Sequence, residues 1–153
     1  MTARTRSRSD PAYVEMPNSS QWTVPLTVEA FAAIEPEIRE FLSLEAVDGH
    51  AAYVSELVIE EIVRNLIVHT PPYTRDETAI VTIEVAAHIV TVVIEDQRPS
   101  FDPFAGPELD VTAPLEQRKA GGMGLHLVRT MADQLTYEAG DDRNRLTAVI
   151  SRR

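Results

Sequence analysis

Three polar residues at helical spacing suit the chemistry of a phosphate ester. Glu61, Asn65 and His69 recur every four residues, so on a helix they stack along one stripe. The stripe overlaps the apolar side of the same segment, which includes Ile62 and Leu66. A carboxylate and an amide on that side need a partner, because burying polar groups without hydrogen bonds is costly.

Two interpretations of this stripe stay open on spacing alone. In the first, the amide oxygen of Asn65 is a hard ligand for Mg²⁺ carried by a phosphate. The carboxylate of Glu61 then takes a proton from an attacking hydroxyl or water. In the second, the pair is satisfied inside the protein and binds nothing. His69 lies near the predicted helix end, where capping or a dipole interaction is the alternative to ligand contact.

A glycine-rich run points to anion binding elsewhere in the chain. Residues 120–129 hold three glycines in four positions, followed directly by apolar residues at helical spacing. A helix start offers unpaired N–H groups and the positive end of the helix dipole, and glycine lets the backbone approach a ligand closely. The run predicts a phosphate cradle. The alternative is a turn that only lets a helix pack closely.

The elements that must position these residues follow from periodicity and from helix and turn signals. Helices are predicted from an N-cap at Thr27 to about residue 42, over residues 50–70 and over residues 122–134. Residues 97–120 contain four prolines and little periodicity, which is typical of a functional loop such as a lid. Strands are predicted at residues 21–26, 78–86, 89–95, 135–138 and 146–151.

The order of these elements predicts the fold class. Helices and strands fall in separate blocks, which favours an α+β two-layer sandwich. We expect a mixed, mostly antiparallel sheet of about five strands, covered on one face by three helices. The sequence divides into a disordered basic tail over residues 1–19 and one domain over residues 20–153. A dinucleotide-binding fold is not expected, because the glycines follow a long loop with the wrong spacing.

Composition excludes several classes of function. The chain has 153 residues, a net charge of −10 and no cysteine, which excludes disulfides and thiolate metal sites and fits a reducing cytoplasm. Direct binding to nucleic acid is not expected, because basic residues cluster only near the two ends. No apolar run is long enough to span a membrane, and no apolar segment of a secretory signal follows the basic start.

Four segments, in order, resemble the motifs of the GHKL ATPases, and most closely those of the small bacterial anti-sigma factor serine/threonine kinases. The resemblance covers about residues 20–152. The segments similar to the family's N box, G1 region, G2 region and closing strand are Glu61-Ile-Val-Arg-Asn65 with His69, Ile94-Glu-Asp96 with Phe101-Asp-Pro103, Gly121-Gly-Met-Gly-Leu-His-Leu-Val-Arg129, and Asn144-Arg-Leu-Thr147.

This resemblance implies a site for ATP and Mg²⁺ in a fold of the Bergerat type. Glu61 would be the general base that activates a serine hydroxyl of a protein substrate. Asn65 would hold Mg²⁺ on the phosphates, and Asp96 would accept a hydrogen bond from the adenine amino group. The residues implied to bind phosphate through backbone N–H groups are Gly122, Gly124 and Leu125, and the residue implied to help hold the base is Thr147.

The resemblance also implies an anti-sigma factor that phosphorylates an anti-anti-sigma factor of the STAS fold and, as a homodimer, sequesters a sigma factor. One departure matters, because Arg98 and Ser100 stand where the family has the two G1 glycines. Arg98 either occludes the pocket or pairs with phosphate. The second hypothesis is therefore a module that has lost nucleotide binding and regulates its partner by binding alone, with Asp96 only capping the next turn.

Overall fold

The computed structural model describes residues 16–69, 76–99, 102–105, 110, 112–114, 116 and 122–153. Residues 1–15 of the predicted tail lie outside this part of the chain, whereas residues 18 and 19 belong to the first strand. Much of the predicted lid over residues 97–120 also lies outside it, together with Ser100 and Gly121.

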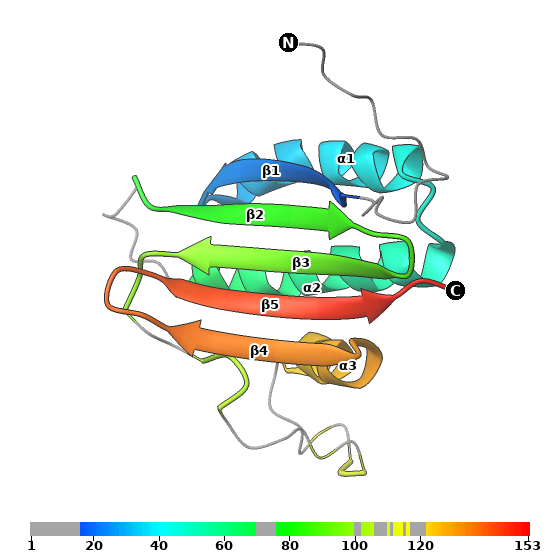
Figure 1. Cartoon of the computed structure of the whole chain (residues 1–153). Coiled ribbons are helices and arrows are strands. Elements are labelled where there is room, and N and C mark those ends of the chain that lie inside the picture. The colour runs from blue at the N-terminus through cyan, green and yellow to red at the C-terminus, as the bar shows by residue number, and fades with distance from the viewer. Residues whose placement is uncertain are drawn as a thin grey trace, which may run out of the picture.

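A five-stranded antiparallel sheet in the order β1-β2-β3-β5-β4 forms one layer of the domain (Figure 1). Four pairings join neighbouring strands, and each is antiparallel. The predicted sheet is confirmed, and the parallel component expected in a mixed sheet is not found among the described residues. Short turns between β2 and β3 and between β4 and β5 require antiparallel neighbours. The strands are β1 (Asn18–Pro25), β2 (Thr78–Val85), β3 (Ile89–Asp96), β4 (Gln134–Ala139) and β5 (Asn144–Ser151).

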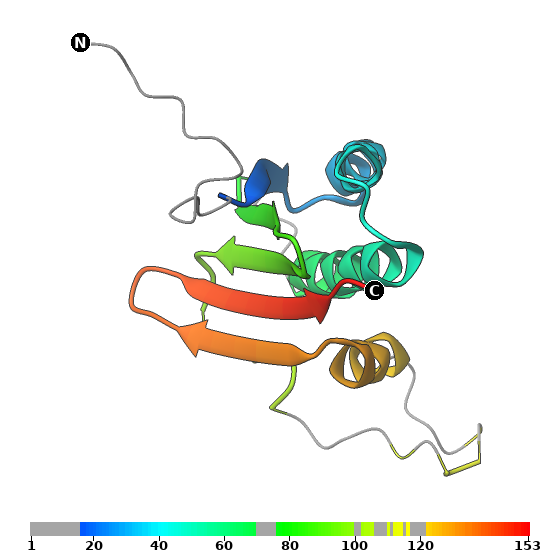
Figure 2. The same cartoon turned by 45° about the vertical axis from the view of Figure 1, so that its right-hand side comes forward.

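The second layer consists of α1 (Val28–Leu44), α2 (Gly49–Val68) and α3 (Met123–Met131), all on one face of the sheet (Figure 2). Alternate residues of β2 and β5 are buried under them, as expected for strands with one covered face. The predicted α+β sandwich is therefore confirmed. Among the described helices, none combines the length and apolar character that crossing a membrane requires.

Both long helices begin at a side-chain cap. The hydroxyl of Thr27 accepts a hydrogen bond from the Ala30 N–H at 3.2 Å, which confirms the predicted cap of α1. Asp48 caps α2 by accepting from the Ala51 N–H at 3.1 Å. Its other carboxylate oxygen accepts from the Arg153 N–H at 3.0 Å. This carboxylate therefore ties the start of α2 to the last residue of the chain.

The cap at Asp48 makes stability depend on pH in the acid range. Hydrogen bonds from the backbone N–H groups of Ala51 and Arg153 lower the pKa of Asp48, and one from Ser151 lowers the pKa of Asp133. A carboxyl whose pKa is lower in the folded state stabilises the fold above its unfolded pKa of about 4. This contribution is lost as the pH falls through the lowered value.

We predict that Asp48→Asn weakens the fall in the free energy of unfolding as the pH drops from 5 to 3. Asparagine keeps an oxygen that can cap α2 but cannot take up a proton. Urea denaturation at several pH values measures this. Asp142→Asn, in the exposed turn between β4 and β5, is the control and should keep the original pH dependence. An unchanged slope in Asp48→Asn would contradict the assignment.

Candidate functional site

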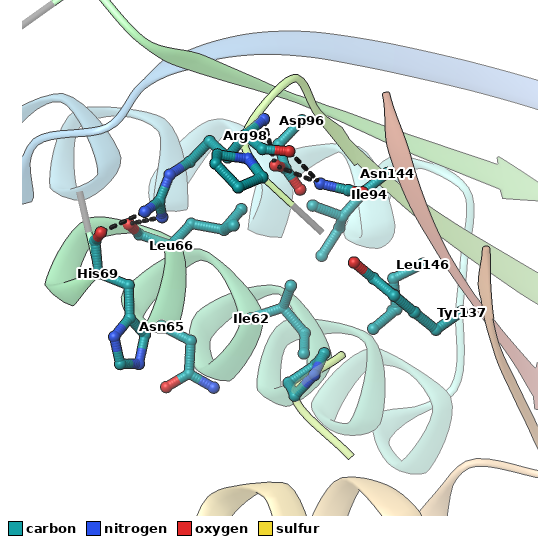
Figure 3. A pocket seen from close by; sticks show the side chains of 12 residues that line it. Ile62, Asn65, Leu66, His69, Ile94, Asp96, Arg98, Tyr137, Asn144 and Leu146 are labelled. Carbon is teal, nitrogen blue, oxygen red and sulfur yellow. Dashed lines mark hydrogen bonds between the residues drawn. The ribbon is translucent and has the colours of Figure 1, made fainter. Parts of the chain in front are cut away.

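A pocket of about 500 Å³, including space open to solvent, lies between α2 and the adjoining ends of β3, β4 and β5 (Figure 3). Its walls are mainly apolar, with a few polar groups that come from separate elements. This is the usual composition of a small-molecule site. The lining residues are Ile62, Asn65, Leu66, His69, Ile94, Asp96, Arg98, Pro99, Pro103, Tyr137, Asn144 and Leu146.

A buried carboxylate and a buried amide meet where β3 ends. Asp96 and Asn144 are direct partners in the register of β3 and β5, and they are 8% and 3% exposed. Nδ2 of Asn144 donates to Oδ1 of Asp96 at 3.1 Å and to the carbonyl of Arg98 at 2.7 Å. The Arg98 N–H also donates to Oδ1 of Asp96, at 2.9 Å. Among the described residues, none donates to Oδ2 of Asp96, which stays available to a ligand.

The side chain of Arg98 reaches from this strand end to the C-terminal end of α2 (Figure 3). Its Nη1 donates to the carbonyl of Leu66 at 2.7 Å, and its Nη2 donates to the carbonyl of His69. Its Nε lies 3.1 Å from Oε2 of Glu77. The last contact is an ion pair rather than an aligned hydrogen bond. The Arg98 side chain is 13% exposed and forms part of the pocket wall.

Of the three polar residues at four-residue spacing on α2, two line the pocket and one does not. Asn65 and His69 line the pocket and project from the same side of the helix (Figure 3). Glu61, one turn earlier, is half-buried and lies against α3. A Cβ added to Gly124 would stand 1.9 Å from the carboxylate carbon of Glu61. Because Gly124 has no side chain, it leaves room for the carboxylate of Glu61.

From residue 122 on, the glycine-rich run forms the start of α3, as predicted. Gly122 is the N-cap, with a φ of 86° that favours glycine over other residues. Glycine has no side chain that could cap the helix, and among the described residues none accepts from the N–H groups of the first turn, which suit an anion. Leu125 packs its side chain against the core, which leaves only its backbone for a ligand.

The family resemblance implied that Thr147 helps to hold the base. The structure does not bring this residue to the pocket. Asn144 and Leu146 line the pocket, and side chains alternate along a strand. Thr147 therefore lies on the opposite sheet face, beside Val93 and Thr136. Asn144 is the functional candidate that sequence reasoning missed. Counting back by two from the apolar Leu146 identifies it.

The chemistry of the site follows from these positions. Asp96 and Asn144 offer hydrogen-bonding groups beside an apolar slot, and Asn65 offers a hard oxygen. The start of α3 does not line the pocket, but it offers backbone N–H groups next to Glu61, one turn before Asn65 on α2. In the described ranges, three or more His, Cys, Asp or Glu side chains nowhere gather as a metal site of their own. The arrangement therefore suits a molecule with a flat polar base and with phosphates that supply most of the oxygen atoms coordinating a metal ion.

Comparison with known proteins places the chain in a family. Residues 24–150 match the profile of the histidine kinase-like ATPase domain. The chain is similar to the crystal structure of the RsbU and RsbW domains of a Mycobacterium tuberculosis protein, with a TM-score of 0.61 and 16% identity. The match covers 88% of this chain and 32% of that one, so the chain spans about a third of that structure. At this identity the likeness shows the fold alone. No curated protein matches the sequence.

The contact between Glu61 and Gly124 gives a testable prediction on stability. Gly124→Ala alone should gain little, because the helix propensity of alanine, about 0.5–1 kcal/mol over glycine, is offset by displacement of the Glu61 side chain. In a Glu61→Ala background the same change should stabilise the protein. Urea denaturation of the four proteins measures the coupling, expected at about 0.5 kcal/mol or more. Additive effects would show that the two residues do not compete for space.

Proposed function

Because the chain belongs to the histidine kinase-like ATPase domain family, we propose that it binds Mg-ATP in this pocket and phosphorylates a serine or threonine of a partner protein. The observation that carries the proposal is the position of Asp96. It is a buried carboxylate with one oxygen held by two donors and the other turned to no donor among the described residues. It lies in the same pocket as Asn65.

The adenine base is proposed to lie between the apolar side chains of α2 and the sheet. Ile62, Ile94 and Leu146 line this part of the pocket and suit the faces of a flat ring. The base's amino group donates to Oδ2 of Asp96. Because the amide nitrogen of Asn144 is held by Asp96 and the Arg98 carbonyl, its amide oxygen remains as an acceptor.

The phosphates are proposed to lie between Asn65 and the start of α3. The amide oxygen of Asn65 would hold Mg²⁺. Few protein ligands are needed, since phosphates and waters supply most of the Mg²⁺ coordination in such sites. When bound, the metal neutralises charge on the transferring phosphoryl group. The N–H groups at Gly122, Gly124 and Leu125 bind phosphate oxygens. Among the described residues, no side chain occupies the space beside Gly122, where glycine leaves the approach open.

Glu61 is proposed as the general base. Its carboxylate accepts the proton of the substrate hydroxyl while the hydroxyl oxygen forms a bond to the γ-phosphorus. The bond from that phosphorus to the β–γ bridging oxygen breaks, and ADP leaves with the electron pair. Glu61 lies against Gly124, beside the proposed phosphate cradle, which is the position that this role requires.

The partners are proposed from the resemblance to the anti-sigma factor kinases. The substrate is a STAS-fold anti-anti-sigma factor, and the second partner is a sigma factor sequestered by a homodimer in the cytoplasm. The likeness to a structure that contains an RsbW domain supports the fold that such a role needs. The net charge of −10 favours basic protein surfaces over nucleic acid as partners.

A second candidate function is regulation by binding alone, and Arg98 is the observation that favours it. Its guanidinium forms part of the pocket wall, at a position where the anti-sigma factor kinases carry glycine. A wall that narrows the pocket enough to exclude nucleotide would leave only the protein surface to act. Calorimetry with Mg-ATP and Mg-ADP discriminates, since absence of heat and of thermal stabilisation at millimolar nucleotide favours this candidate.

We predict that Glu61→Gln separates binding from catalysis. Loss of the general base should slow phosphoserine formation on the cognate STAS-fold protein about 100-fold or more, while Mg-ATP affinity stays within about threefold by calorimetry. The matched control is Glu60→Gln, because Glu60 pairs with Arg64 on the helix surface. Phosphoserine formation at the normal rate in Glu61→Gln would show that another group takes the proton.

A further inference from the structure

The two proposed sides of the nucleotide site lie on elements that are far apart in the sequence and meet through the hydrophobic core. Asn65 belongs to the last turn of α2, and Asp96 ends β3, thirty-one residues further along the chain. A ligand that bridges them needs a fixed distance between its base-binding and metal-binding groups, because productive positioning tolerates little error. A contact that joins the end of α2 to the end of β3 therefore affects the whole site.

Arg98 makes that contact through its side chain. The guanidinium donates to two carbonyls of the final turn of α2, those of Leu66 and His69. The last carbonyls of a helix have no partner within the helix, and a positive charge there is favourable because the helix dipole is negative at that end. The last turn of α2 has no basic residue of its own, so Arg98 supplies this charge from a different element.

The backbone of the same residue is fixed at the other side of the site. The Arg98 N–H donates to Asp96, and the Arg98 carbonyl accepts from Asn144. Glu77, next to the start of β2, lies 3.1 Å from the guanidinium Nε and balances its charge. Arg98 therefore contacts the end of β3, where the base is proposed to bind, through its main chain. It contacts the end of α2, where the metal is proposed to bind, through its side chain.

We propose that Arg98 is a positioning residue that sets the distance between the end of β3, which binds the base, and the end of α2, which binds the metal. In this proposal Arg98 does not bind phosphate itself. The inference rests on the proposed function. It accounts for an arginine where the anti-sigma factor kinases carry glycine. A phosphate contact would require the guanidinium to leave two carbonyls and a carboxylate, and charge-assisted bonds in a mostly buried position are costly to give up.

The test compares Arg98→Met with Arg98→Lys, using Arg64→Met as the control. Methionine keeps an unbranched apolar stem in place of the arginine stem and removes the charge and the donors. Lysine keeps the charge but cannot donate to both carbonyls in the same geometry. Arg64 lies on α2, the helix that Arg98 contacts, and pairs with Glu60 at 2.7 Å, but it is exposed and does not line the pocket. Two measurements are made: amide hydrogen exchange without nucleotide, and calorimetric titration with adenosine and with Mg-ATP.

In Arg98→Met we expect amide exchange of residues 66–69 and of residue 98 to rise about tenfold without ligand, the size that loss of charge-assisted hydrogen bonds predicts. Adenosine affinity should stay within about threefold, because strand pairing and Asn144 still hold Asp96, whereas Mg-ATP affinity should fall about tenfold or more. Arg98→Lys should be intermediate, and Arg64→Met should match the original protein in both measurements.

Three results would overturn the proposal. Unchanged exchange with weakened Mg-ATP binding would make Arg98 a direct phosphate ligand. Equal losses for adenosine and Mg-ATP would reduce it to general support of the fold, and no effect on either measurement would leave it without a positioning role. If the original protein binds no nucleotide, the proposed function fails. Hydrogen exchange then still decides whether Arg98 joins the two elements.

Discussion

The site depends on a buried carboxylate that has to be hydrogen-bonded where a strand ends. Asp96 is 8% exposed, and a carboxylate in such a place is stable only when donors surround it. The antiparallel register of β3 and β5 puts Asn144 directly opposite, and the chain turns back so that the Arg98 N–H supplies a second donor. The position of this pair fixes the path of the chain beyond β3 and therefore the place from which Arg98 reaches α2.

Much of the fold could be predicted from local signals because those signals act over a few residues. Apolar spacing identified the three helices and five strands, and the cap at Thr27 was found at its predicted place. The hydrogen bond from the Arg153 N–H to Asp48 could not be predicted, because its two residues come from distant parts of the chain. A contact between such distant residues leaves no trace in the surrounding sequence.

The candidate site was predicted well where periodicity decides it and poorly where packing does. The four-residue spacing correctly placed Asn65 and His69 on one side of α2, while Glu61 turned toward α3 because Gly124 leaves space there. The alternation of side chains along β5 decides that Asn144, and not Thr147, faces the pocket. The expectation for Thr147 came from the family motif and did not use this alternation. The reach of Arg98 to α2 depends on tertiary structure, because its partners lie about thirty residues away.

The contact between Gly124 and Glu61 has a consequence for how this sequence can evolve. Any side chain at position 124 displaces the carboxylate at position 61, so the two positions are not free to vary independently. A lineage that keeps the carboxylate in its present place must also keep the glycine, although alanine would form a better helix. Once a descendant has lost the carboxylate, position 124 is released and helix propensity can select its residue. Substitutions at these two positions should therefore appear in a fixed order along a lineage.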